Sequence, residues 1–127
     1  MSELICLQLS VVLWLAHVLT QAFSARAEFG DKYLFSSRDS SPVPKGLAYG
    51  RATRALKNYI ENMVPFIGLD LALIATQQTG GLGATLWIIG RALYLPIYVL
   101  GVGYVRTAAW ALSVLGLLMM LARLAGY

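Results

Sequence analysis

Three long apolar stretches constrain this chain more than any other feature of its sequence. They cover residues 4–23, 86–105 and 107–124, and the only charged side chains inside them are Arg91 and Arg123. A helix needs roughly 20 mainly apolar residues to cross the hydrocarbon core of a bilayer. Each stretch therefore predicts a membrane-spanning helix. No basic residue precedes the first stretch, which argues against a cleavable signal peptide.

A fourth spanning helix is predicted from a shorter apolar run. Residues 63–76 are too few to cross a bilayer alone, but the residues before them have helical spacing, so the helix should start near Gly50. The composition of 58% hydrophobic and 13% charged residues departs from the averages of soluble domains, about 45–50% and 25%. We therefore expect an all-α membrane protein, with residues 1–127 forming a single four-helix transmembrane domain.

Basic residues are concentrated around the connection between the first two predicted helices. Seven of the ten Lys and Arg residues lie between positions 24 and 57, and the net charge is +4. Loops rich in Lys and Arg stay on the cytoplasmic side of a membrane. This placement predicts a polar, non-helical loop over residues 24–49 in the cytoplasm and both termini outside. Topology therefore explains the charge without a nucleic-acid partner.

Four polar side chains share one face of the second predicted helix. They are spaced three, four and three residues apart, within an arc of roughly 80°: Arg51, Arg54, Asn58 and Glu61. Glu61 borders the apolar run, where an unpaired carboxylate is costly. The alternative is a solvated helix end, which suits Arg51 and Lys57 better than Glu61. This face is therefore a candidate binding site.

A second polar face lies on the third predicted helix, where Arg91, Tyr94 and Tyr98 are spaced i, i+3 and i+7. An arginine inside an apolar segment costs at least about 2.5 kcal/mol, so Arg91 should meet a carboxylate, a ligand or water. The alternatives are an ion pair with Glu61 for the arginine and interfacial anchoring for the tyrosines. Arg106 begins the fourth helix, either as a topology marker or as a cation that lowers the pKa of a ligand thiol.

Together these faces place guanidiniums, a carboxamide, a carboxylate and phenols at one membrane edge. Such a site suits a small ligand with several charges. Ligand carboxylates would pair with arginine, and a ligand ammonium would pair with Glu61. The single cysteine, Cys6, excludes an intramolecular disulfide and should pack as a small hydrophobic residue.

The motif Arg51-x2-Arg54-Ala55-x2-Asn58-x2-Glu61-Asn62-x2-Pro65-Phe66 resembles the second-helix signature of the MAPEG family, the membrane-associated proteins of eicosanoid and glutathione metabolism. Arg91-x2-Tyr94-x3-Tyr98 is similar to the third-helix pattern of one branch of that family. Two further segments resemble small bacterial members: Ser37-Arg38-Asp39, and Tyr104-Val105-Arg106-Thr107-Ala108-Ala109-Trp110. The similarity extends over nearly the whole chain in the same order.

The resemblance implies a homotrimer that binds glutathione as a cosubstrate and needs no metal. The first and second helices of one subunit and the third and fourth of its neighbour would enclose the ligand. Arg106 would be the catalytic residue that stabilises the thiolate. The residues that would hold glutathione are Arg26, Arg54, Asn58, Glu61, Arg91, Tyr94 and Tyr98.

The implied function is a glutathione transferase or peroxidase of the bacterial inner membrane. Its partners would be membrane lipid, glutathione and a lipophilic electrophile or lipid hydroperoxide. The alternative is a non-catalytic scaffold protein that binds lipid or glutathione. A transporter fits less well, because the polar groups gather at one edge and only Asp70 lies deeper.

Other polar and small residues carry expectations about helix packing. Asp70 should be protonated, paired across the trimer axis, or hydrogen-bonded to Gln77. His17 should form a hydrogen bond between helices, because no cluster of metal ligands surrounds it. Small residues of the third helix should allow close packing: Gly83, Gly90 and Ala92.

Overall fold

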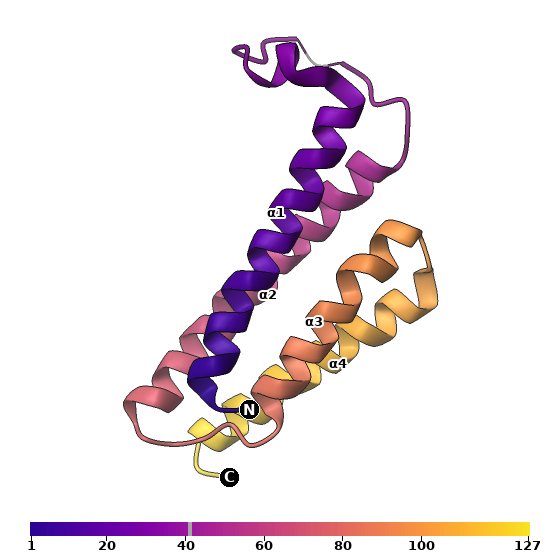
Figure 1. Ribbon diagram of the computed structural model, residues 1–127. Helices are drawn as coiled ribbons and strands as arrows, with labels where there is room; N and C mark the ends of the chain where they lie inside the picture. The colour runs from indigo at the N-terminus through magenta and orange to yellow at the C-terminus, as the bar shows by residue number, and fades with distance from the viewer. Residues whose placement is uncertain (41) are drawn as a thin grey trace.

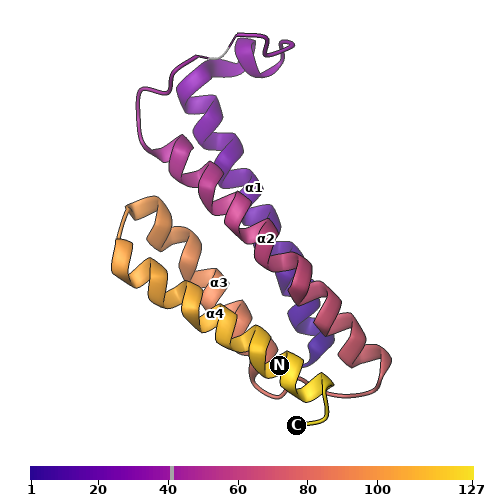
Figure 2. The same ribbon diagram turned by 180° about the vertical axis from the view of Figure 1, so that it is seen from behind.

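The computed structural model describes residues 1–40 and 42–127, which form four helices and contain no strand. These are α1 (Glu3–Leu34), α2 (Ala48–Ala75), α3 (Gly83–Leu100) and α4 (Gly103–Leu124). Helices α1 and α2 make a long antiparallel hairpin, and α3 and α4 make a shorter one beside it (Figure 1). Both termini lie at one end of the molecule, as Figure 2 also shows. The prediction of an all-α, four-helix protein is confirmed.

Helix α1 continues well past its apolar stretch. The prediction of a non-helical loop over residues 24–49 is wrong for residues 24–34, because the helix ends only at Leu34. Good helix formers, including Ala25, Arg26 and Glu28, extend the helix beyond Phe23. Gly30 then breaks the regular backbone with φ 78° and ψ 161°, a conformation that glycine adopts readily. The connection to α2 therefore begins at Phe35.

Helices α1, α3 and α4 are long and apolar enough to cross a membrane. Helix α2 is not among them, because charged side chains interrupt its sequence. Its 28 residues give a length of about 42 Å, and it runs alongside α1 in both views (Figures 1 and 2). A crossing by α2 requires that its polar face be covered by protein or ligand, so the fourth span stays a prediction.

An aromatic core joins α2 to α3. Phe66 stacks on Trp87 with ring centroids 3.9 Å apart, and Tyr59 lies 5.7 Å from the same Trp87 ring. Cys6 of α1 is fully buried in this cluster. Its expected packing as a small hydrophobic residue is therefore confirmed.

Helices α3 and α4 approach each other through glycines. A methyl group on Gly83 would lie 2.7 Å from the carbonyl oxygen of Gly116, and one on Gly90 would lie 2.8 Å from that of Ala109. The expectation of close packing is therefore confirmed for both glycines. It is wrong for Ala92, which is exposed.

The end of α3 is fixed by a left-handed glycine and by an arginine from α2. Gly101 has φ 80° and ends the helix at Leu100, so the predicted span over residues 86–105 is too long. Nη1 of Arg51 donates a hydrogen bond of 3.2 Å to the carbonyl oxygen of Val99. A cation at this position also favours the negative end of the helix dipole. Arg51 therefore joins α2 to α3, instead of occupying a solvated helix end.

Candidate functional site

Most of the predicted site residues meet where α2 faces α3 and α4. Two open clefts of about 290 and 250 Å³ adjoin there, because they share Asn58, Tyr94 and Tyr98 as lining residues. Helix α4 completes the first cleft with Arg106, Thr107 and Trp110. Helix α2 completes the second with Arg54, Lys57 and Glu61. The two clefts together are called the polar cleft below, and they bring together all the predicted site residues except Arg26, Arg51 and Arg91.

Tyr98 of α3 links the two arginines that border the polar cleft. Nε of Arg54 donates a hydrogen bond of 3.1 Å to the Tyr98 hydroxyl oxygen. The guanidinium carbon of Arg106 lies 4.9 Å from the centre of the same ring, a cation–π distance. Within the described part of the chain Arg106 makes no ion pair, so its donors are available to a ligand.

Arg91 lies behind the wall of the polar cleft and is fully buried. Its Nη1 donates a hydrogen bond of 2.9 Å to Oδ1 of Asn58. The guanidinium carbon lies 4.2 Å from the ring centre of Tyr94 and 5.4 Å from that of Tyr59. Nε and Nη2 have no hydrogen-bond partner among the described residues. Arg91 therefore touches two residues of the cleft wall without lining the cleft itself.

The alternative expectation for Arg91, an ion pair with Glu61, is wrong. The one ion pair within residues 1–40 and 42–127 joins Arg26 to Asp31 at 3.0 Å, with both side chains exposed. A buried guanidinium without a counter-charge is costly in an apolar segment. Arg91 therefore places a positive charge directly behind the cleft wall. Arg26 itself lies on α1 and does not line the polar cleft.

The orientation of the Asn58 carboxamide follows from its contact with Arg91. A guanidinium can only donate hydrogen bonds, so Asn58 must turn its oxygen toward Arg91. Its NH₂ group is then left for the polar cleft, because Asn58 lines both of the adjoining clefts. Arg54 and Lys57 add further donors, and Glu61 is the only carboxylate among the lining residues. The cleft therefore complements a ligand with carboxylates and one ammonium.

Three lining residues are missing from the prediction made from sequence: Lys57, Thr107 and Trp110. Lys57 was expected at a solvated helix end, yet it lines the cleft one turn before Glu61. Trp110 likewise follows Arg106 by one turn. Residues four apart lie on the same side of a helix, so this spacing was the signal that could have found both.

Tyr59 supports Arg91 from the side away from the cleft, and no sequence signal identified it. Its hydroxyl donates to the backbone oxygen of Ser10, and its ring stacks on His17 with centroids 4.3 Å apart. Nδ1 of His17 bonds to the carbonyl oxygen of Leu13 in its own helix at 2.7 Å. The predicted hydrogen bond between helices is therefore wrong for His17, whose contact with α2 is a ring stack.

Asp70 lies apart from the polar cleft, in the half of α2 nearer the chain termini. Both of its carboxyl oxygens are buried without a hydrogen-bond partner among the described residues. The expected hydrogen bond to Gln77 is therefore absent. Glu3, close to Asp70, accepts a hydrogen bond of 2.8 Å from the backbone nitrogen of Gly80. These acidic groups are separate from the residues of the polar cleft.

Comparison with known proteins agrees with the motifs of the second and third helices. The model of the MAPEG family matches residues 4–126 of the 127-residue chain. Comparisons with curated proteins and with solved structures gave no match. The matched range includes every residue that lines the polar cleft.

Proposed function

Because the chain belongs to the MAPEG family, we propose that it is a membrane enzyme that activates the thiol of glutathione in the polar cleft. The thiolate attacks a lipophilic electrophile or reduces a lipid hydroperoxide. One observation carries this proposal: Arg54, Asn58 and Glu61 of α2 line the same pair of adjoining clefts as Arg106 of α4. The motif residues of α2 and Arg106 are far apart in sequence, yet they line one site.

The charges of the polar cleft support a peptide thiol as the ligand. Glutathione carries two carboxylates, one ammonium and one thiol. Arg54 and the Asn58 NH₂ group suit a carboxylate, because charged and neutral N–H donors can bind its two oxygens. Glu61, the only carboxylate lining the cleft, suits the ammonium. The thiol is left for Arg106, at the other end of the shared wall.

Arg106 supplies the chemistry in this proposal. A guanidinium beside a thiol stabilises the thiolate and lowers the thiol pKa, so a nucleophile forms at neutral pH. In conjugation, the thiolate sulfur forms a bond to an electrophilic carbon while the bond from that carbon to a leaving group or to an epoxide oxygen breaks. The leaving group departs with the bonding electron pair, whereas an opened ring oxygen takes up a proton from water. In peroxide reduction, the sulfur takes the outer oxygen of the hydroperoxide, which releases an alcohol and leaves a sulfenic acid. A second glutathione converts the sulfenic acid to a disulfide and water.

A homotrimer is the assembly that we propose around this site. The polar cleft is open in the single chain, and large apolar side chains are exposed on the outer faces of the helices. These include Val12, Val64, Leu93 and Leu118. Lipid or neighbouring subunits must cover such faces, and a neighbour placed over the polar cleft would close it.

The proposed location is a bacterial inner membrane with the loop between α1 and α2 in the cytoplasm. The polar cleft lies toward this loop, because it uses the first half of α2, the end of α3 and the start of α4. Glutathione therefore enters from the cytoplasm, and the lipophilic substrate enters from the bilayer.

Thiolate formation provides the direct test. Purified protein in detergent is mixed with glutathione, and ultraviolet thiolate absorbance and proton release are recorded. Wild type should give both signals and Arg106→Ala should give neither. Arg123→Ala, which removes an exposed arginine from the other end of α4, is the matched control. Equal signals in wild type and Arg106→Ala would remove the mechanism. Bound glutathione without conjugation or peroxidase turnover would favour the non-catalytic scaffold protein instead.

A further inference from the structure

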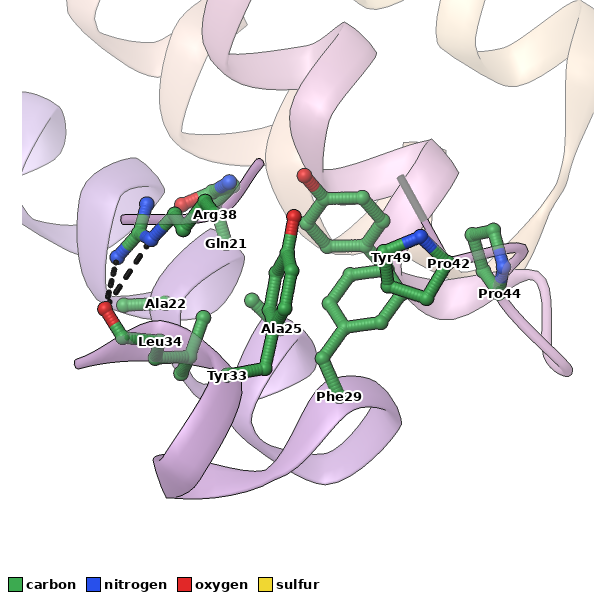
Figure 3. A pocket seen from close by; sticks show the side chains of 10 residues that line it. All are labelled: Gln21, Ala22, Ala25, Phe29, Tyr33, Leu34, Arg38, Pro42, Pro44 and Tyr49. Carbon is green, nitrogen blue, oxygen red and sulfur yellow. Dashed lines mark hydrogen bonds between the residues drawn. The ribbon is translucent and has the colours of Figure 1, made fainter. Parts of the chain in front are cut away.

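A second cavity, separate from the polar cleft, lies between the end of α1, the loop that follows it and the first turn of α2 (Figure 3). Its volume is about 330 Å³, and it shares no lining residue with the polar cleft. Six of its ten lining residues are apolar: Ala22, Ala25, Phe29, Leu34, Pro42 and Pro44. The polar lining residues are Gln21, Tyr33, Arg38 and Tyr49. We call this space the loop cavity.

Aromatic contacts hold the wall of the loop cavity in place. The Phe29 ring meets Tyr49 edge-on, with centroids 4.9 Å apart, and lies 5.4 Å from the Tyr33 ring. Figure 3 shows these three rings beside one another. The Tyr33 hydroxyl also donates a hydrogen bond of 3.0 Å to the carbonyl oxygen of Ser40. The loop is therefore tied to α1, and α1 is tied to α2, around a preformed space.

Arg38 gives one end of this cavity a positive charge. Its backbone is left-handed, with φ 56°, which is uncommon for a residue other than glycine. This conformation lets Nε and Nη2 donate to the carbonyl oxygen of Leu34 at 3.1 and 3.0 Å (Figure 3). Nη1 makes no hydrogen bond to a residue that the structure describes, so the guanidinium can still donate to a ligand.

The acidic side chains of the same region are already engaged elsewhere. Glu28 accepts hydrogen bonds from the backbone nitrogens of Lys45 and Gly46, at 2.8 and 2.9 Å. Asp31 is paired with Arg26, and Asp39 accepts a hydrogen bond from the Ser37 hydroxyl. Within the described residues, no carboxylate is therefore paired with Arg38. An anion from outside the chain would complete the cavity.

The loop cavity lies where α1 leaves its apolar stretch, and this position favours an anion that belongs to an amphiphile. Its lining begins at Gln21, where the apolar stretch of residues 4–23 ends, and tyrosines typically mark such a membrane–water boundary. We propose that the loop cavity binds the anionic head and adjoining chain of an amphiphile, either a fatty acid or an acidic phospholipid. The anion lies at Arg38, and the chain packs on Phe29 and Ala25. A volume near the low end of ligand pockets, about 300–1,000 Å³, suits part of a lipid and not all of it.

Ligand pairs that differ only in charge test this proposal. Full-length protein in a neutral detergent is titrated with oleate and with its uncharged methyl ester. Oleate should bind at least about tenfold more tightly, the usual effect of one charge-assisted hydrogen bond. Nanodiscs of phosphatidylglycerol or phosphatidylcholine, analysed for retained lipid, test the phospholipid source. Binding of oleate or of phosphatidylglycerol in preference to its neutral counterpart supports the site, and no preference in either pair overturns it.

Variants then locate the binding. Arg38→Gln should weaken binding about tenfold, whereas Lys32→Gln, the same charge loss outside the cavity, should leave it unchanged. Ala22→Phe should block binding by filling the cavity while Arg38 is kept, so the result does not depend on how Arg38→Gln folds. Equal losses in Arg38→Gln and Lys32→Gln, or unaltered binding in Ala22→Phe, would overturn the proposal. Glutathione plays no part in these measurements, so their outcome is independent of the proposed enzyme activity.

Discussion

The polar cleft and the loop cavity both border the first half of α2, but they are built in different ways. The polar cleft takes its residues from three helices, and nearly all of them are charged or can form hydrogen bonds. The loop cavity takes its residues from one helix end, a loop and one helical turn, and six of its ten lining residues are apolar. Helix faces therefore fix the charges of the polar cleft, whereas a loop helps to enclose the loop cavity.

The largest effect should come from Arg106, because in the proposed mechanism it acts on the reacting sulfur atom. Arg106→Ala should lower kcat roughly 10²- to 10³-fold, the usual result of removing one donor that stabilises a developing anion. Glutathione affinity should fall far less, since Arg54, Asn58 and Glu61 remain. Steady-state kinetics with a soluble electrophile measures both quantities. Lys32→Gln should leave both at wild-type values, and a similar loss of kcat in that variant would show that the effect is not specific to Arg106.

Glu61 should account for recognition of the ligand ammonium. Glu61→Gln should weaken glutathione binding about tenfold, because a charged hydrogen bond contributes roughly 1.5–3 kcal/mol. N-acetylglutathione, which lacks the ammonium, should bind wild type and Glu61→Gln with equal affinity. Isothermal titration of the four combinations measures this coupling. An equal loss for both ligands would show that Glu61 acts on the cleft in general and not on the ammonium.

The residues of the polar cleft were largely predictable because they repeat with the period of a helix. Arg54, Asn58 and Glu61 lie three or four residues apart, and so do Arg91, Tyr94 and Tyr98. The spacing does not show how deeply each side chain is buried. Arg91 shares a face with Tyr94, yet it is fully buried behind the wall, because α2 packs over it through Asn58 and Tyr59.

The loop cavity could not be predicted, because it depends on where α1 stops. Composition suggested a polar loop from residue 24, but the helix continues to Leu34 and carries Phe29 and Tyr33 toward Tyr49 of α2. The left-handed backbone of Arg38 likewise accompanies a hydrogen bond from its side chain to Leu34. Such contacts join residues without a fixed spacing, so no periodic pattern identifies them.

Arg91 and Asn58 should have a smaller, shared effect on the polar cleft. Asn58→Asp keeps the contact with Arg91 but presents an oxygen to the ligand carboxylate, so glutathione affinity should fall severalfold to about tenfold. Arg91→Met should lower affinity less and leave thermal stability unchanged or higher, because a buried charge is replaced by an apolar chain. In a double-mutant cycle the losses should not add, since Arg91 acts by orienting Asn58. Additive losses would assign Arg91 a direct contact with the ligand.

Gly30 should have the smallest effect and should separate the two sites most cleanly. Gly30→Ala places a side chain where φ is 78°, which should destabilise the protein by about 1–3 kcal/mol and shift the last turn of α1. Oleate binding should weaken severalfold, whereas glutathione binding should persist, because no residue of the polar cleft lies on α1. The control Gly68→Ala, at an exposed position in the second half of α2 with free space around it, should stabilise by about 0.5–1 kcal/mol. Equal losses of both ligands in Gly30→Ala would mean that the two sites depend on one shared backbone arrangement.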